Sequence, residues 1–122
     1  MAKKILIVDD SRTIRQQVGF TLSKEGFEVV EAEDGQDGLN KLQATPDISM
    51  IISDVNMPNM DGLVMIESIR KIEQFKFIPI IMLTTESSGD KVERAKKAGA
   101  SGWLVKPFNS EQLVGAVKKL AR

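Results

Sequence analysis

The chain contains no cysteine and no histidine, and these two absences exclude several kinds of chemistry at once. Without thiols or imidazoles it cannot assemble a zinc site from the usual ligands or use an imidazole base in catalysis. The missing cysteines also exclude a secreted scaffold held together by disulfides. Whole classes of enzymes are thereby removed from consideration.

Long apolar runs are also missing, and the charges balance. No stretch approaches the roughly 18 consecutive apolar residues that cross a bilayer. The apolar start of the chain is interrupted by Asp9 and Asp10, too early for a signal peptide. We therefore expect a soluble, cytoplasmic protein with no membrane partner. Lys plus Arg and Asp plus Glu both total 17, so the formal charge is zero and no broad basic surface is available to bind nucleic acid.

What the chain does contain is a regular alternation of short apolar runs with segments of helical period. The apolar runs that predict strands cover residues 5–8, 29–30, 50–52, 78–83 and 103–105. The first of the five helices should begin at the N-cap Ser11 and stop at Gly26. Gly99 should close the fourth helix, and Asn109 or Ser110 should cap the fifth.

This alternation predicts an α/β fold. A chain of 122 residues is long enough to bury a core of two or three layers, so we expect one domain over residues 1–122. Strands that are almost entirely apolar indicate a parallel sheet covered by helices on both faces. The sequence leaves the strand order open. We adopt the flavodoxin-like, doubly wound order 2-1-3-4-5 with right-handed crossovers.

The residues that follow the strands carry the functional signal, because ligands of open α/β sheets bind outside the carboxyl ends of the strands. Asp9 and Asp10 follow the first run and Asp54 the third, while Thr84 follows the fourth and Lys106 the fifth. With the first and third strands as neighbours, three carboxylates converge. Each residue alone is also explained as a cap, a turn former or a solvated side chain. Five of them at the same end of four strands favour a functional site.

Three converging carboxylates repel one another and raise each other's pKa values unless a hard cation neutralises them. Mg²⁺ meets that need, since it prefers oxygen ligands and usually retains waters. A carboxylate such as Asp54 is a recognised covalent nucleophile, and the metal would polarise an incoming phosphoryl group. Lys106 would neutralise another phosphoryl oxygen, and Thr84 would donate a hydrogen bond.

These residues and their surroundings resemble the receiver domains of two-component response regulators, most closely those of chemotaxis. The resemblance covers essentially the whole chain and rests on residues 8–10, 54–62, 84 and 106–108. It implies that Asp54 accepts a phosphoryl group from a phosphohistidine on a sensor histidine kinase of the chemotaxis type. The Mg²⁺ ligands that it implies are Asp9, Asp10, Asp54 and the carbonyl of Asn56.

The resemblance also implies a switch. Phosphorylation adds about two negative charges and should draw Thr84 towards the phosphoryl group, after which an aromatic residue on the fifth strand moves inward. Here that residue is Trp103, where the family more often has Tyr or Phe. Taken alone, Trp103 reads as a half-buried core residue. In the family a cis proline, here Pro107, aims the lysine that precedes it, Lys106, inward.

Asn56 and Glu86 occupy positions that tune the phosphoryl lifetime in the family, and this pairing suggests a short-lived signal. Glu86 is equally well explained as a solvated loop acid. The implied protein is a regulator that catalyses its own phosphorylation and dephosphorylation and is not a turnover enzyme in the usual sense. Its fourth helix, fifth strand and fifth helix would form a surface that binds a downstream target, with a flagellar motor switch as one candidate. We expect a free-standing monomer.

Three alternatives fit less well. A haloacid-dehalogenase-like phosphotransferase normally has a second Asp two residues after its nucleophile, where this chain has Asn56. A flavin-binding electron carrier would need a loop rich in Ser, Thr and Gly after the first strand, where two acids stand instead, and no Gly-rich nucleotide motif occurs. A degenerate receiver that only binds partners is disfavoured by the complete set of site residues.

Overall fold

The sheet of the computed structural model has five parallel strands in the order β2-β1-β3-β4-β5, which confirms the flavodoxin-like order. The structure describes residues 3–55, 57–84, 89–106 and 108–120. The strands are β1 (Lys4–Val8), β2 (Glu28–Ala32), β3 (Ile48–Asp54), β4 (Ile80–Thr84) and β5 (Gly102–Val105). Every neighbouring pair is parallel, so all the carboxyl ends meet at one edge of the sheet.

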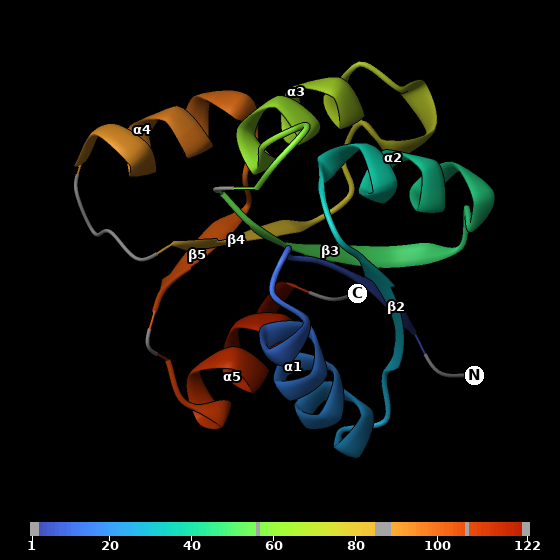
Figure 1. Cartoon of the computed structure of the whole chain (residues 1–122), viewed down its shortest axis with the longest axis vertical. Coiled ribbons are helices and arrows are strands. Elements are labelled where there is room, and N and C mark those ends of the chain that lie inside the picture. Colours follow the sequence, from blue (N-terminus) through green and yellow to red (C-terminus); the bar gives the residue numbers. More distant parts are fainter. Residues whose placement is uncertain (1–2, 56, 85–88, 107, 121–122) are drawn as a thin grey trace.

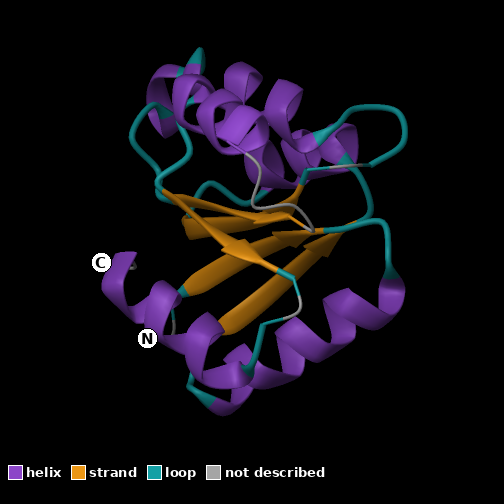
Figure 2. Cartoon of the chain, turned by 90° about the vertical axis from the view of Figure 1, so that its left-hand side faces the viewer, coloured by secondary structure: helices purple, strands orange, loops and turns teal. Residues whose placement is uncertain are grey.

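Helices cover both faces of this sheet, as Figures 1 and 2 show. They are α1 (Arg12–Lys24), α2 (Gly35–Ala44), α3 (Gly62–Arg70), α4 (Gly89–Ala98), α5 (Ser110–Leu120) and the short 3₁₀ helix η1 (Glu73–Phe75). α1 and α5 lie on one face, and α2, α3 and α4 lie on the other (Figure 1). In the described part of the chain, no helix combines the length and hydrophobicity needed to span a bilayer.

Two apolar cores lie between the layers, because successive side chains of a strand point to opposite faces of the sheet. From β1, Leu6 and Val8 join the core under α2, α3 and α4. Ile5 and Ile7 join the core under α1 and α5. All four side chains are fully buried. The unbroken apolar runs of the sequence are therefore a consequence of a sheet that must be apolar on both faces.

The predicted ends of the helices are largely confirmed. The Ser11 side chain accepts a hydrogen bond from the backbone three residues on, at 3.3 Å, and so caps α1. Of the two candidate caps of α5, Asn109 is used: its Oδ1 accepts from the Gln112 N–H at 2.8 Å, and the Gln112 side chain accepts from the Asn109 N–H at 3.0 Å. Gly26 and Gly99 follow α1 and α4 with φ values of 91° and 109°.

Three details differ from the prediction. β4 begins at Ile80, two residues into the apolar run. Proline has no N–H to donate to a ladder, and the Pro79 carbonyl only accepts from the Ile51 N–H at 3.0 Å. Asp54 and Thr84 are the last residues of their strands and do not follow them. The helix η1 was not predicted, because three residues are too few to show a helical period.

Candidate functional site

The carboxyl ends of β1 and β3 bring three carboxylates together. β1 and β3 are neighbours, and Val8 of β1 lies opposite Ser53 of β3. The residues that follow these two, Asp9 and Asp54, therefore also lie side by side. One carboxylate oxygen from each of Asp9, Asp10 and Asp54 lies within 4.8 Å of the other two. The convergence expected from the strand order is present in the fold.

Asp9 is the buried member of this cluster, with its side chain 1% exposed. Its Oδ1 accepts a hydrogen bond from the Ser11 N–H at 2.9 Å, and its Oδ2 lies 3.4 Å from Lys106 Nζ. The Asp9 backbone is held too: its N–H donates to the Ala32 carbonyl at 3.1 Å, and its carbonyl accepts from the Arg15 guanidinium. A buried carboxylate needs such partners, because an unpaired buried charge is strongly unfavourable.

Asp54 is the member of intermediate burial and remains partly accessible, with its side chain 14% exposed. Its Oδ1 accepts from the Val55 N–H at 2.8 Å, and its Oδ2 lies 3.6 Å from Lys106 Nζ. Burial raises the pKa of Asp54, and the nearby Asp9 carboxylate raises it further. Lys106 and the Val55 N–H oppose that rise in pKa, and Asp10 adds to it. In the protein alone, the ionised form of Asp54 is therefore disfavoured.

The two remaining candidates lie at the neighbouring strand ends: Thr84 is the last residue of β4, and Lys106 directly follows β5. The Lys106 N–H donates to the Thr84 carbonyl at 2.6 Å. Thr84 is buried and stands opposite Val105, while its neighbour Leu83 stands opposite Asp54. The end of β4 therefore lies between Asp54 of β3 and Lys106, which follows β5, as expected from the sequence pattern.

Trp103 lies further back on the edge strand β5, opposite Met82 of β4. Side chains two residues apart in a strand share a face, so Trp103 lies on the same face of the sheet as Thr84. It is 37% exposed, and Lys96 Nζ of α4 lies 4.9 Å from the ring centroid. Trp103 is thus an exposed aromatic residue that belongs to neither core, so the expectation of a half-buried core residue is wrong, and its role as a switch stays a prediction.

Three other candidate residues, Asn56, Glu86 and Pro107, lie outside the residues that the structure describes. Their expected roles as a metal ligand, in phosphoryl lifetime and in aiming Lys106 remain predictions from the family resemblance.

The donor set of the cluster fits a hard divalent cation. Its ligand atoms are all carboxylate oxygens, the type that Mg²⁺ and Ca²⁺ prefer. Three carboxylates carry −3 when ionised, and Lys106 contributes +1, which leaves an excess of −2. Mg²⁺ would neutralise that excess and reverse the rise in the pKa of Asp54.

Gly62 had no predicted role beyond the family resemblance, but the fold requires a glycine at this position. A Cβ atom at this position would lie 2.2 Å from the Asp54 carbonyl oxygen and 2.7 Å from Met82 Cε. The Gly62 N–H also donates to the Val55 carbonyl at 2.8 Å. Gly62 therefore lets α3 begin directly against the backbone of Asp54. In the sequence, the dipeptide Asp61-Gly62 is the feature from which the start of this helix could have been predicted.

A second feature that the sequence analysis missed is a hydrogen bond between Asp34 and Asn59, at 2.8 Å. These residues belong to two different loops, and neither loop has a period or motif that would reveal the contact. Only the dipeptide Asp34-Gly35, typical of a helix start, marks one of the partners.

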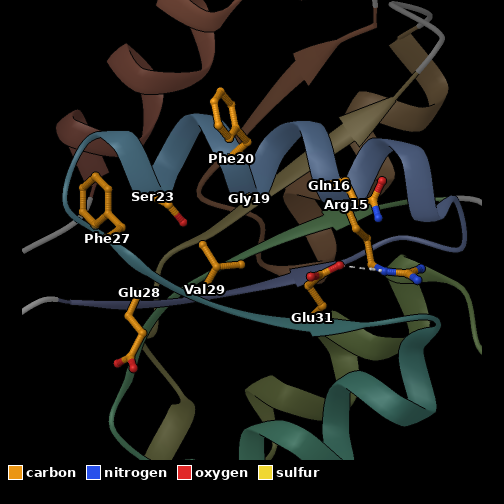
Figure 3. Close-up of a pocket in the computed structure, with 9 residues that line it drawn as sticks. All are labelled: Arg15, Gln16, Gly19, Phe20, Ser23, Phe27, Glu28, Val29 and Glu31. Carbon is orange, nitrogen blue, oxygen red and sulfur yellow. Dashed lines mark hydrogen bonds and ion pairs between the residues drawn. The ribbon is translucent and has the colours of Figure 1, made fainter.

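Two surface grooves lie near the carboxylate cluster. A groove of about 680 Å³ lies between α1 and β2, and Arg15 Nε contacts Glu31 Oε1 there at 3.1 Å. Figure 3 shows its lining residues, with Phe20 pointing outward. None of the three clustered carboxylates lines this groove. A more apolar groove of about 570 Å³ between α1 and α5 is lined by Phe20, Phe108 and Lys106, among others, and so borders the cluster.

The chain is similar to known proteins along nearly its whole length. The family model described as "response regulator receiver domain" matches residues 5–118. The chemotaxis protein CheY1 of Helicobacter pylori is 46% identical over 111 residues, which cover 90% of each chain. A CheY homolog of Campylobacter jejuni is 40% identical, over 90% of this chain and 85% of that protein.

Solved structures agree with these sequence matches. The chemotaxis protein CheY4 of Vibrio cholerae superposes with a TM-score of 0.94 at 48% identity, covering 98% of this chain and 99% of that one. A response regulator of Chloroflexus aurantiacus gives a TM-score of 0.93 at 31% identity, covering 98% of each chain.

Proposed function

This chain belongs to the response regulator receiver domain family and is a signalling regulator of the CheY type, and from that premise we propose that Asp54 is its phospho-acceptor. The proposed donor is a phosphohistidine on a partner kinase. One observation carries the proposal: Asp54 Oδ2 lies 3.6 Å from the Lys106 ammonium, inside a cluster of three carboxylates.

In the proposed step, a lone pair of Asp54 Oδ2 forms a bond to phosphorus while the N–P bond of the donor breaks. The electron pair of that bond returns to the imidazole nitrogen, which takes up a proton, and the product on this chain is an acyl phosphate. Oδ1 is already engaged by the Val55 N–H, so Oδ2 is the proposed nucleophile. Because burial raises the pKa of Asp54, more of the reactive carboxylate forms as the pH rises through that pKa.

Asp9, Asp10 and Asp54 are the side chains that would hold Mg²⁺, with the Asn56 carbonyl as a further ligand from the family pattern. When bound, the ion would polarise the phosphoryl oxygens and offset their charge. Lys106 would move from its present contacts with Asp9 and Asp54, at 3.4 and 3.6 Å, to a phosphoryl oxygen. We further propose that the chain promotes the loss of this phosphoryl group, on a timescale set by Asn56 and Glu86.

The output is proposed to run through β4 and β5. The Thr84 hydroxyl would donate a hydrogen bond to the phosphoryl group, and Trp103 would move towards the space that Thr84 leaves. Both residues lie on the same face of adjacent strands, which supports this route. The surface of α4, β5 and α5 would then bind a downstream target, with a flagellar motor switch as one candidate.

The kinase that donates the phosphoryl group must reach the carboxyl edge of the sheet. The groove between α1 and α5 supports an approach from that side, because Lys106 lines the groove and also contacts Asp9 and Asp54. A partner seated there would lie directly beside the proposed nucleophile.

Incubation with Mg²⁺ and acetyl phosphate tests this proposal. We expect intact-mass spectrometry to show one added phosphoryl group on the wild-type chain and none on Asp54→Asn. Asp47→Asn is the matched control, because it removes the same carboxylate at the opposite end of β3, where Asp47 pairs with Lys4 at 2.9 Å. An Asp54→Asn chain that gains the phosphoryl group as efficiently as the wild type would overturn the assignment.

A further inference from the structure

Two turns are fastened together beside the carboxylate cluster. The first turn connects β2 to α2 and contains Asp34, and the second follows Asp54 and contains Asn59. Asn59 Nδ2 donates to Asp34 Oδ2 at 2.8 Å. The Gly35 N–H donates to the Met60 carbonyl at 3.0 Å. A side-chain bond and a backbone bond therefore join the two turns at adjacent positions, and we call this pair of bonds the turn clamp.

Asp34 does more in this clamp than a helix cap requires. Its Oδ1 accepts from the Asp37 N–H at 2.8 Å and caps α2, which uses one carboxylate oxygen. The second oxygen accepts from Asn59, and the residue is 7% exposed. The Asp37 N–H and then Asn59 hold the pKa of Asp34 below its ordinary value. Asp34 is therefore an ionised, buried carboxylate with both oxygens bonded.

The backbone of both turns is shaped for this contact. Asn59 has a φ of 66°, a left-handed conformation that asparagine tolerates better than most residues. At Gly35, a Cβ atom would lie 2.5 Å from the Met60 carbonyl oxygen, so a side chain there would break the backbone bond. Each turn therefore has a suitable residue at the point of contact. Asn59 tolerates the positive φ, and Gly35 has no Cβ that would displace the Met60 carbonyl.

The clamp connects directly to the segments that carry the clustered carboxylates. The end of β2 holds Asp9, because the Ala32 carbonyl accepts from the Asp9 N–H at 3.1 Å. On the other side, the Gly62 N–H donates to the Val55 carbonyl at 2.8 Å and closes the loop that begins at Asp54. The end of β2 is therefore bonded to Asp9, and the turn that follows β2 is bonded to the loop after Asp54.

We propose that Asp34 and Asn59 are positioning residues of the Mg²⁺-dependent phospho-acceptor site, and that their hydrogen bond sets the distance between the Asp9 loop and the loop after Asp54. This inference rests on the proposed function. Neither residue belongs to the carboxylate cluster; each acts through the backbone of the loop it holds. Residues that orient metal ligands from outside typically change metal affinity by about 10- to 100-fold when they are altered, so we expect a loss of about tenfold in Mg²⁺ affinity without the clamp.

Two variants separate positioning from folding. Asp34→Ser keeps a side-chain oxygen that can cap α2 but cannot also reach Asn59. Asn59→Gly keeps the left-handed backbone and removes the donor. Calorimetric titration should show Mg²⁺ binding weakened about tenfold in each variant, and no further weakening in the double variant, because both changes remove the same bond. In the metal-free protein, hydrogen exchange at the Gly35 and Gly62 amides should become faster in both variants.

Asp61→Ser is the matched control. Asp61 caps α3, its Oδ1 accepting from the Val64 N–H at 2.9 Å, so the change replaces one capping carboxylate in the same loop and removes the same charge. It should leave Mg²⁺ affinity within about twofold of the wild type. Mg²⁺ affinities of Asp34→Ser and Asn59→Gly that equal the wild-type value would overturn the positioning role alone. A wild-type chain that binds no Mg²⁺ would overturn the proposed function together with this role.

Discussion

The two central strands that carry the carboxylates and the edge strand that carries Trp103 are built differently. Ile5 to Val8 of β1 are all fully buried, and β3 is buried over most of its length. In β5, burial alternates, and Trp103 and Val105 remain 37% and 38% exposed. The clustered carboxylates thus project from strands that are packed on both faces. Trp103, the residue of the proposed output, lies on a strand with one face partly exposed.

This difference has a physical consequence for signalling. Interiors are close-packed, so a side chain in β1 or β3 cannot move without opening a void or creating a clash. The strand ends from which the carboxylates project are therefore rigid. A half-exposed side chain on β5 loses less packing when it changes rotamer. A change at the ends of β1 and β3 is therefore more easily accompanied by a rotamer change on β5 than by one on β1 or β3.

The largest expected difference between the two kinds of strand is in the free energy of unfolding that is lost when a side chain is truncated. Ile51 on β3 is fully buried, so Ile51→Ala should lower the free energy of unfolding by about 2 to 5 kcal/mol. Val105 is partly exposed, and Val105→Ala should lower it by less than about 1 kcal/mol. Chemical denaturation of both variants measures the contrast. Equal losses would mean that β5 is as tightly packed as β3.

A smaller effect comes from the charge of the cluster. Without Mg²⁺, Asp54→Asn should raise the free energy of unfolding by on the order of 1 kcal/mol, because it removes one of three facing carboxylates. Burial and Asp9 raise the pKa of Asp54 in the folded state. The penalty of ionising Asp54 is therefore absent below its unfolded-state pKa, grows as the pH rises through the folded-state pKa, and is complete above it.

Denaturation of wild type and Asp54→Asn at several pH values, in a chelator, measures that penalty. The stabilising effect of the substitution should shrink as the solution is acidified. Saturating Mg²⁺ should remove it as well, since the ion would offset the repulsion in the wild type. A substitution that destabilises the metal-free chain at neutral pH would contradict this electrostatic description.

The smallest expected effect concerns the edge strand itself. Lys96 Nζ lies 4.9 Å from the Trp103 ring centroid, a cation–π contact worth about 0.5 to 1 kcal/mol at an exposed site. Lys96→Met should therefore shift the balance between outward and inward Trp103 by about two- to fivefold. Trp103 is the only tryptophan of the chain, so acrylamide quenching of its emission reports the change directly, and quenching should decrease.

Lys97→Met serves as the control for this measurement, because it removes the same charge one residue along α4. Quenching in Lys97→Met should match the wild type. Identical quenching in all three proteins would show that Lys96 does not hold the ring outward.

The sequence predicted the fold and the cluster well, because both depend on patterns along the chain. An apolar run such as that of β1 identifies a doubly buried strand, and a polar residue after it marks the carboxyl edge. Asp9 and Asp54 could thus be brought together once the strand order was chosen. The order itself was a choice among doubly wound folds, since nothing local in the sequence states which strands are neighbours.

The features that were missed depend on contacts between different elements of the fold. Asp34 and Asn59 meet across two turns, and the close approach at Gly62 depends on where α3 lies against Asp54. Neither leaves a periodic trace in the sequence. The contact of Lys96 with Trp103 is of the same kind, because it joins a helix to a strand that follows it through the packing of both on the sheet.

Calorimetric titration of the metal-free wild-type chain with Mg²⁺ tests the central claim most directly. If Asp9, Asp10 and Asp54 form one divalent-cation site, the titration should saturate at one ion per chain, and Asp9→Asn should weaken the binding severely. A titration of the wild type without a saturable response, or an Asp9→Asn chain that binds Mg²⁺ as tightly as the wild type, would contradict the claim.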